Sequence, residues 1–137
     1  MRRRARDSNA ELQAIAASGI RYSSAPVGED QNLLWDVVDT DAGGPGGANH
    51  SCDPSLWMRD ERTVCARRDI GAGEELTMDY ALVTVTPEWR MQCQCGTSAC
   101  RGVVTGNDWR IPELQQRYAG LFSPFIHARI SRAGIVT

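Results

Sequence analysis

Apolar and polar residues are arranged along the chain in a way that predicts short strands between helical ends. Residues 7–20 predict a short helix, because apolar residues recur there at helical spacing. The apolar stripe consists of Leu12, Ile15 and Ala16. The residues able to cap the start of this helix are Asp7, Ser8 and Asn9. Gly19 is placed to end it.

The middle of the chain predicts strands. Residues 33–38 (LLWDVV) form an apolar run that predicts a buried strand, and the glycine-rich residues 39–48 predict a loop. Residues 63–70 and 75–80 contain many strand-forming residues and are joined by Gly-Ala-Gly-Glu, which predicts a hairpin. Residues 82–86 extend the second of these strands or form a third. The pattern as a whole predicts a fold that is mainly β with short helices.

The last part of the chain predicts a helical tail of two helices. Residues 112–122 begin with Pro112, which suits the first turn of a helix. One face of this helix carries three apolar residues: Leu114, Tyr118 and Leu121. Residues 123–130 have the same kind of start, with Ser123 as the cap and Pro124 as the first helical residue.

Composition and charge narrow the class of protein. The chain has 137 residues, of which 42% are hydrophobic and 23% charged, as expected for one globular domain with a modest core. The formal net charge of -2 gives no overall attraction to nucleic acid or anionic membrane. No apolar run approaches the ~20 residues of a membrane span. We therefore expect a cytoplasmic protein with no direct nucleic-acid partner and no membrane partner. The sequence gives no prediction of its oligomeric state.

The basic residues are all arginine apart from two histidines, and the chain contains no lysine. The chain therefore cannot be methylated or acetylated on a lysine side chain of its own.

The five cysteines point to metal binding before disulfides, since a reducing compartment disfavours disulfides. Three of them lie close together in CQCGTSAC: Cys93, Cys95 and Cys100. Thiolates this close repel one another unless a cation neutralises them, which favours zinc. Structural zinc takes four ligands, so one ligand has to come from elsewhere in the chain.

Two cysteines and one histidine are candidates for the fourth ligand. Cys52 is the favoured one, because it follows Asn-His-Ser in an irregular segment where a side chain can be aimed freely. Cys65 lies in the middle of a predicted strand and is more simply a small buried residue. His50 could bind the metal in place of Cys52, but two ligands this near along the chain could hardly reach one tetrahedral ion together. A site closed by four sulfurs is structural rather than catalytic.

Three segments in order along the chain, NHSCDP, GEELTMDY and CQCGTSACRG, resemble the SET domain and post-SET motifs of protein lysine methyltransferases. The resemblance runs from about Leu33 to Trp109 and is greatest to the small bacterial members. It implies a SET fold of small β-sheets around a pseudoknot, in which the NHSC and DY segments thread together. It also implies a division into a SET domain (1–88), a post-SET zinc-binding segment (89–110) and a C-terminal helical tail (111–137).

The resemblance implies roles for individual residues. The cofactors would be S-adenosyl-L-methionine and structural zinc, and the substrate a protein or peptide lysine or a small amine. Asn49 and His50 match the cofactor-binding pair of the family. Tyr80 matches its catalytic tyrosine, and Trp109 could pack on the adenine. The residues that match the zinc ligands are Cys52, Cys93, Cys95 and Cys100.

One motif of the family has no match in this chain, the glycine-bearing GxG strand that clasps the methionine part of the cofactor. The GGPGG segment (43–47) is a poor substitute, because it directly precedes NHSC and no strand leads into it. We therefore expect a SET domain that is incomplete at its N-terminus, as a fragment of a longer enzyme would be. One alternative is a catalytically inactive SET-like module that keeps the zinc and binds a partner. Another is that an unusual N-terminus or a second subunit supplies the missing part of the cofactor site.

Overall fold

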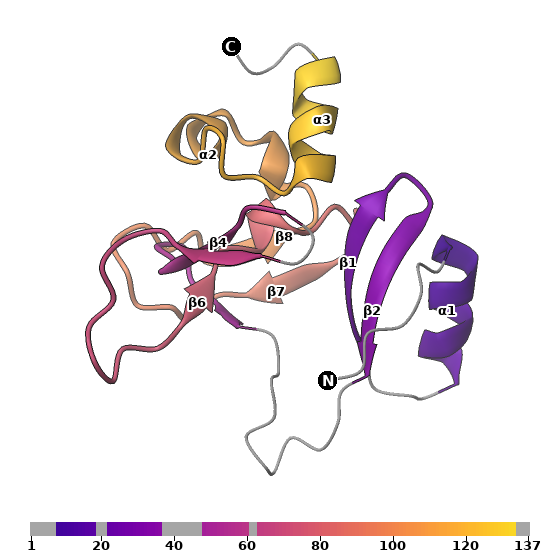
Figure 1. The fold of residues 1–137 in the computed structure, drawn as a ribbon, viewed down its shortest axis with the longest axis horizontal. Coiled ribbons are helices and arrows are strands. Elements are labelled where there is room, and N and C mark those ends of the chain that lie inside the picture. Colours follow the sequence, from indigo (N-terminus) through magenta and orange to yellow (C-terminus); the bar gives the residue numbers. More distant parts are fainter. Residues whose placement is uncertain (1–7, 19–21, 37–47, 61–62, 134–137) are drawn as a thin grey trace. The chain divides into compact units, whose positions relative to one another are not determined.

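The computed structural model describes four ranges of the chain, drawn in colour in Figure 1: residues 8–18, 22–36, 48–60 and 63–133. They belong to two compact units, Met1–Gly47 and Ala48–Thr137. No helix in the described ranges is long and apolar enough to cross a membrane.

The first unit contains the predicted N-terminal helix, α1 (Asn9–Ala17), which is confirmed. Its capping residue is Ser8. The Ser8 hydroxyl accepts a hydrogen bond from the Glu11 N–H (3.2 Å), and the Glu11 carboxylate accepts one from the Ser8 N–H (2.6 Å). This reciprocal pair satisfies two N–H groups at the helix start that have no partner within the helix. Asp7 and Gly19, the other expected boundary residues, lie outside the described ranges.

The rest of the first unit is a hairpin of two antiparallel strands, β1 (Tyr22–Gly28) and β2 (Gln31–Asp36). β2 confirms the strand predicted at 33–38 as far as Asp36; the remaining two residues and the predicted glycine loop up to Gly47 lie outside the described ranges. β1 was not predicted, because its sequence YSSAPVG combines proline, glycine and small polar residues, which are weak strand formers.

Asn9 ties α1 to the turn of this hairpin. Its N–H donates to the Asp30 carboxylate (2.8 Å), and its side-chain amide donates to the Glu29 carbonyl (3.1 Å). The buried Asn32 of β2 donates in turn to the Asn9 side-chain oxygen (2.8 Å). A single asparagine at the helix start therefore makes three polar contacts with the hairpin.

The second unit is built around a four-stranded sheet in the order β3-β6-β4-β5. The strands are β3 (Asn49–His50), β4 (Leu56–Met58), β5 (Val64–Ala66) and β6 (Thr77–Met78). β3 and β4 both pair parallel with β6, whereas β4 and β5 pair antiparallel. The NHSC segment and the DY segment therefore lie side by side, as the family resemblance implied.

The predicted hairpin between 63–70 and 75–80 is wrong. β5 does not pair with β6, because β4 lies between them and β6 already uses its two edges for β3 and β4. The Gly-Ala-Gly-Glu segment is an exposed turn instead. In this turn the Glu74 carboxylate accepts a hydrogen bond from the Gly71 N–H (3.0 Å). The three-residue strand 56–58 was not predicted, since its residues follow an irregular segment.

Residues 82–86 form neither of the predicted strands. After β6 the chain turns into a 3-10 helix, η2 (Tyr80–Leu82). The Asp79 carboxylate causes this turn, because it accepts the Ala81 N–H (2.9 Å) as a helix cap does. The following residues up to Thr86 are irregular.

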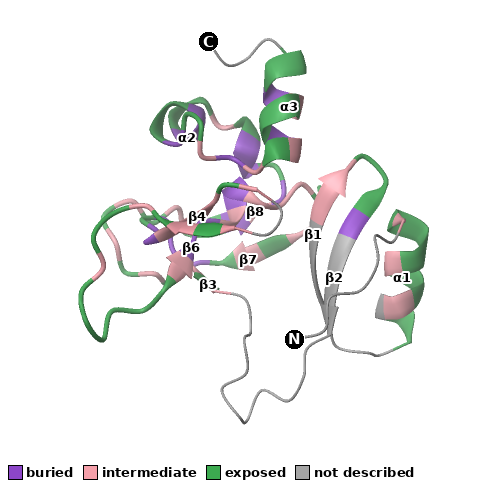
Figure 2. Ribbon diagram, viewed as in Figure 1, coloured by how far each residue is buried: buried purple, intermediate pink, exposed green. Residues whose placement is uncertain are grey.

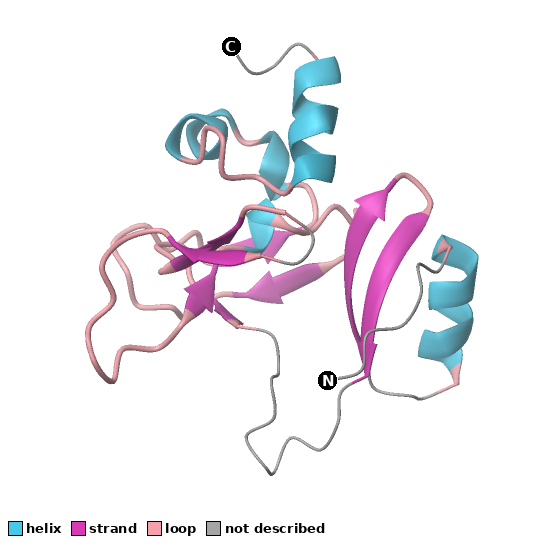
Figure 3. Cartoon of the chain, in the orientation of Figure 1, coloured by secondary structure: helices cyan, strands magenta, loops and turns pink. Residues whose placement is uncertain are grey.

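The remaining elements follow in sequence order, and Figure 3 distinguishes helices, strands and loops by colour. They are β7 (Arg90–Gln92), β8 (Val103–Thr105), the 3-10 helix η3 (Asp108–Arg110), α2 (Pro112–Arg117) and α3 (Pro124–Arg132). β7 and β8 pair antiparallel and carry the three clustered cysteines in their connection. Both predicted tail helices are confirmed, although α2 ends at Arg117. The side chain of the predicted cap Ser123 makes no capping hydrogen bond, and its hydroxyl is buried without a partner among the described residues.

The core of the second unit joins the strand region to the tail helices (Figure 2). Its buried residues are Met78, Ala81, Leu82, Trp109, Leu114, Tyr118, Phe122, Ile126 and Ile130. Two of the three residues predicted on one face of the first tail helix, Leu114 and Tyr118, are therefore core residues. A smaller cluster of Cys52, Cys93 and Val104 lies under the cysteine segment.

Gly106 gives a test of the packing between β8 and the segment before β7. A Cβ added at Gly106 would lie 1.6 Å from the Thr86 carbonyl oxygen, which belongs to the backbone and cannot turn aside. We expect Gly106→Ala to lower the free energy of unfolding by about 2 kcal/mol or more. Gly71→Ala is the matched control, because its Cβ would come no closer than 3.9 Å to another atom. Equal urea midpoints for the two variants would contradict this packing.

Candidate functional site

The structure brings four cysteines from two distant segments into one cluster. The sulfurs of Cys52, Cys93, Cys95 and Cys100 all lie within 4.8 Å of one another. Cys52 follows β3, and the other three lie between β7 and β8. Gly96 and Gly102 have φ angles of 72° and 76°, the left-handed region that glycine adopts without strain, and they allow this connection to fold tightly.

The distances suit a tetrahedral metal ion. Zinc–thiolate bonds of about 2.3 Å require sulfurs about 3.8 Å apart, and the Cys52 and Cys93 sulfurs are 3.8 Å apart. Within the described ranges no other group of three or more potential ligands is as close together. Cys65 does not belong to the cluster. It lies in β5 opposite Trp57, as its strand position predicted, but is only half-buried.

The thiols of the cluster are unequal. Burial raises the pKa of Cys93 to about 12. Burial also acts to raise the pKa of Cys95, but hydrogen bonds to the Thr97 hydroxyl (3.3 Å) and to backbone N–H groups outweigh it and bring the pKa to about 6. The Cys95 thiol therefore ionises readily. A bound divalent cation would favour the ionised form of all four thiols.

His50 lies beside the cluster and connects it to Tyr80. The Tyr80 N–H donates to His50 Nδ1 (3.1 Å), so this nitrogen carries no proton and the proton of the neutral ring is on Nε2. Nε2 lies 3.3 Å from the Cys52 sulfur. Burial lowers the pKa of His50, against the opposing effect of the Asp79 carboxylate 3.8 Å away, and this favours the neutral ring.

A pocket of about 380 Å³ opens next to the cluster. Its lining includes three residues predicted for cofactor binding or catalysis: Asn49, His50 and Tyr80. The other lining residues are Ser51, Glu75, Thr77, Met91, Gln92, Cys93, Gln94 and Cys95. The Asn49 side-chain amide donates to the Glu75 carboxylate (2.8 Å), so its oxygen stays available as an acceptor.

Tyr80 is half-buried at this pocket, at the start of η2. Its hydroxyl donates to the Ala48 carbonyl (2.9 Å), and its ring contacts the rings of His50 and Trp89. Burial raises the pKa of Tyr80, so the phenol stays protonated at neutral pH. The side chain can therefore orient a polar group by hydrogen bonding but is poorly suited to act as a base.

Trp109 is not brought to the pocket. It is a core residue, 5% exposed, and the guanidinium groups of Arg110 and Arg129 lie over its ring. This geometry does not support the expectation that Trp109 packs on an adenine ring. The sequence favoured that role only because Trp109 follows the cysteine segment, whereas η3 turns the ring into the core.

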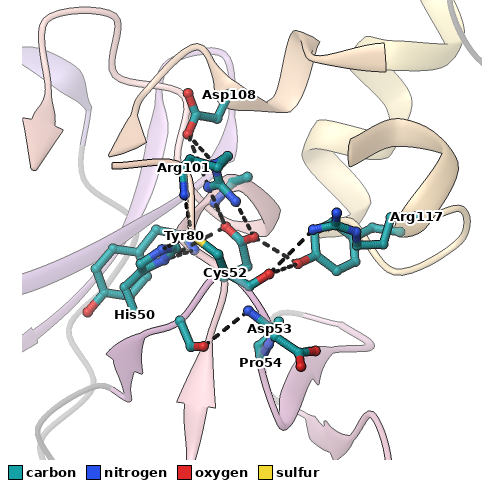
Figure 4. Close-up of polar contacts among 12 residues, drawn as sticks. His50, Cys52, Asp53, Pro54, Tyr80, Arg101, Asp108 and Arg117 are labelled. Carbon is teal, nitrogen blue, oxygen red and sulfur yellow. Dashed lines mark hydrogen bonds and ion pairs between the residues drawn. The ribbon is translucent and has the colours of Figure 1, made fainter. Parts of the chain in front are cut away.

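A buried charge network lies between the cluster and the core, and the sequence analysis missed it (Figure 4). Arg101 forms a bidentate pair with the fully buried Asp79 (2.7 and 2.9 Å), and its Nε donates to Asp108 (3.1 Å). Its backbone N–H points to the Cys52 sulfur (3.4 Å). The sequence signal was the arginine directly after the last clustered cysteine, but nothing in the pattern identifies its partners.

The network holds Asp79 ionised. Burial alone would raise the pKa of Asp79, but the hydrogen bonds and charge of Arg101, with help from the Ala81 N–H and Tyr118 hydroxyl, outweigh it and lower the pKa. The stabilisation by this carboxylate is therefore fully present at neutral pH and is lost only as the pH falls below the usual range of aspartate.

Tyr118 of the tail joins the same network. Its hydroxyl lies 2.8 Å from the Asp79 carboxylate and 3.2 Å from the Cys52 carbonyl. Arg117 donates to the same carbonyl (3.4 Å), as Figure 4 shows. The residues at the end of α2 therefore fix the backbone of a clustered cysteine.

These features define a small β domain in which two parallel strand pairs place a polar pocket beside a four-thiol cluster. The SET domain family matches residues 4–81, more than half of the chain, and the chain belongs to this family.

Three relatives illustrate the similarity. The chain is 37% identical over 73 residues to "Histone-lysine N-methyltransferase ash1" of Drosophila melanogaster, covering 48% of this chain and 3% of the relative. It is 40% identical over 74 residues to "Histone-lysine N-methyltransferase ATX2" of Arabidopsis thaliana (49% and 6%). It is 44% identical over 63 residues to "Histone-lysine N-methyltransferase TRX1" of Oryza sativa subsp. japonica (41% and 6%). The chain thus spans only a few per cent of the length of these relatives. No solved structure shows a significant match to it.

The charge network predicts a large effect of removing one carboxylate. Asp79→Asn keeps the size of the side chain but leaves Arg101 with a single charged partner. We expect the free energy of unfolding to fall by about 3 kcal/mol, because the asparagine NH2 group then faces buried donors that both Asp79 oxygens accept from, and at least one of these donors loses its acceptor. Urea unfolding followed by tryptophan fluorescence measures this. The control Asp69→Asn removes the same charge at an exposed position and should have little effect. Similar losses in both variants would mean that the network does not stabilise the fold.

Proposed function

We propose that this chain carries the active site of an S-adenosylmethionine-dependent methyltransferase that acts on a protein lysine. Membership of the SET family and the names of the three relatives support the reaction class. The observation that carries the proposal is the convergence of Asn49, His50 and Tyr80 on one pocket. Asn49 and His50 lie in β3 and Tyr80 directly follows Asp79 after β6, so the parallel β3–β6 pair brings them together.

The pocket suits a cationic cofactor. Among the described residues that line the pocket, Glu75 has the one carboxylate, none is arginine, and burial favours the neutral ring of His50. The Glu75 carboxylate favours a ligand with positive charge, and the side-chain oxygen of Asn49 offers an acceptor to an amino group. Bound S-adenosylmethionine would supply a methyl group on a sulfonium centre. In this proposal, Asn49 and His50 are the residues that hold it.

Tyr80 would orient the reacting groups. Its hydroxyl oxygen and the Ala48 carbonyl oxygen are 2.9 Å apart, so two oxygens lie close together at one site. Such oxygens can accept C–H···O contacts from a polarised methyl group. Each contact is weak, but several together orient the methyl group. Because the phenol stays protonated, the acceptor amine must lose its proton to water before transfer. Burial next to a cation would lower the pKa of that amine from about 10.4 and so favour this loss.

The cysteine cluster would hold a structural zinc ion. Four sulfur ligands leave no open position, so the metal would not take part in the reaction. Its role would be to join the segment between β7 and β8 to Cys52, two residues after β3, and so to complete one wall of the pocket. Cys93 and Cys95 support this role, because they belong both to the cluster and to the pocket lining.

The substrate and setting follow from the same proposal. The acceptor would be a lysine in a partner protein or peptide, and the chain offers no lysine of its own for self-methylation. A cytoplasmic location and a bacterial origin remain predictions. The runner-up function is a SET-like interaction module without catalysis.

Cofactor titration combined with a tyrosine variant tests the function. Titration calorimetry of the zinc-loaded chain with S-adenosylmethionine should give saturable binding. Methyl transfer to lysine peptides from a tritiated cofactor should then be lowered about 100-fold or more in Tyr80→Phe, because the amine and the methyl group lose an aligning contact. Labelled lysine can form only in the added peptide, since the chain has no lysine of its own.

The matched control is Tyr22→Phe, a tyrosine of the first compact unit. It should bind and turn over as the unchanged chain does. A folded, zinc-loaded chain that binds no cofactor would contradict the methyltransferase proposal and favour the interaction module. Cofactor binding with unchanged turnover in Tyr80→Phe would contradict only the role of Tyr80.

A further inference from the structure

Arg101 contacts both the cysteine cluster, through Cys52, and the residue next to Tyr80, Asp79. It follows Cys100 directly and lies in the short connection between the cysteine cluster and β8. Its side chain is mostly buried, with 13% exposed, and all three of its nitrogens are bonded to carboxylates. An arginine that is needed only for solubility or surface charge would not be enclosed in this way.

The contacts of Arg101 close a ring that contains the cluster and Tyr80. On one side its backbone N–H points to the Cys52 sulfur, which His50 Nε2 also contacts (3.4 and 3.3 Å). His50 Nδ1 then accepts the Tyr80 N–H (3.1 Å). On the other side the guanidinium binds Asp79, the residue before Tyr80, through two hydrogen bonds. Figure 4 shows this arrangement around His50, Tyr80 and Arg101.

Asp79 and Tyr80 are each held by hydrogen bonds in this ring. The carboxylate of Asp79 is held by Arg101, and the N–H of Tyr80 is held by a histidine that contacts a clustered cysteine. A change in the cluster therefore reaches Tyr80 by two routes that start at Cys52. One passes through His50 and the other through Arg101 and Asp79. We propose that Arg101 is a positioning residue, which holds Tyr80 in the orientation that methyl transfer needs and couples that orientation to the cysteine cluster. This inference rests on the proposed function.

The geometry explains why arginine is required here. A planar guanidinium can meet the two oxygens of Asp79 and still donate through Nε to Asp108. Asp108 is held in place by the Thr105 hydroxyl (2.8 Å). A lysine at the same position keeps the charge but has a single nitrogen, so it cannot make the paired contact and the Asp108 contact together. Arg101→Lys therefore removes the paired hydrogen bonds that orient Asp79 while retaining the positive charge.

The test compares Arg101→Lys with the unchanged chain, both loaded with zinc and with their metal content measured. The chain has three tyrosines, so labelling with 3-fluorotyrosine gives three ¹⁹F signals, which Tyr→Phe variants assign. We expect the Tyr80 signal to shift or broaden in Arg101→Lys at full metal content, while the Tyr22 signal is unchanged. In turnover assays kcat should fall about tenfold to 100-fold, with KM for the peptide nearly unchanged.

The control is Arg90→Lys, which makes the same substitution at an exposed position of β7. It should leave all three signals and kcat unchanged. A purely structural role for Arg101 would lower the melting temperature and move the Tyr118 signal, but would leave Tyr80 and kcat as they are. An unmoved Tyr80 signal in fully metal-loaded Arg101→Lys overturns the inference.

A second variant covers the case in which Arg101→Lys does not fold. Asp108→Asn leaves the two hydrogen bonds between Arg101 and Asp79 and weakens only the contact between Arg101 and residue 108. The Tyr80 signal should then move in the same direction by a smaller amount, and an unmoved signal overturns the inference. If the unchanged chain shows no turnover, the proposed function has failed, but the ¹⁹F comparison still decides whether Arg101 positions Tyr80.

Discussion

The closeness of four thiol groups is the constraint on which the rest of the second unit depends. Sulfurs within 4.8 Å of one another cannot all be ionised without a cation, and their separation matches a tetrahedral zinc site. One sulfur comes from Cys52, two residues after β3, and three come from the connection between β7 and β8. Closing the site therefore joins two segments about 40 residues apart in the sequence, and the pocket that contains Tyr80 forms at this junction.

A second set of interactions makes the junction specific. Metal–thiolate bonds in the proposed zinc site would fix the sulfurs but not the orientation of the strands that carry them. Arg101 supplies this orientation, because it binds two buried carboxylates with a fixed fork of donors. Tyr118 extends the same contacts to the tail through Asp79 and the Cys52 carbonyl. The tail helices are thereby part of the support of the candidate site as well as of the core.

The features predicted correctly from the sequence are those that depend mainly on local residue patterns. The N-terminal helix follows from its apolar spacing and Ser8, and the four cysteines follow from their spacing and the irregular segment around Cys52. The strand pairing of the four-stranded sheet in the second unit could not be predicted, because its strands have two or three residues and their order depends on contacts between distant segments. The position of Trp109 was missed for a similar reason, since η3 turns its ring into the core. The partners of Arg101 are equally non-local.

The most direct test of this account is the metal coordination of the cluster, measured by X-ray absorption at the zinc edge of the purified chain. The account predicts one tightly bound zinc ion with four sulfur neighbours at about 2.3 Å and no nitrogen neighbour. His50 is the nearest competing ligand, with Nε2 3.3 Å from the Cys52 sulfur. A nitrogen in the first coordination sphere would mean that His50 replaces a cysteine through Nε2, so that this nitrogen is no longer free for the proposed cofactor. That result, or a folded chain without bound metal, would contradict the account.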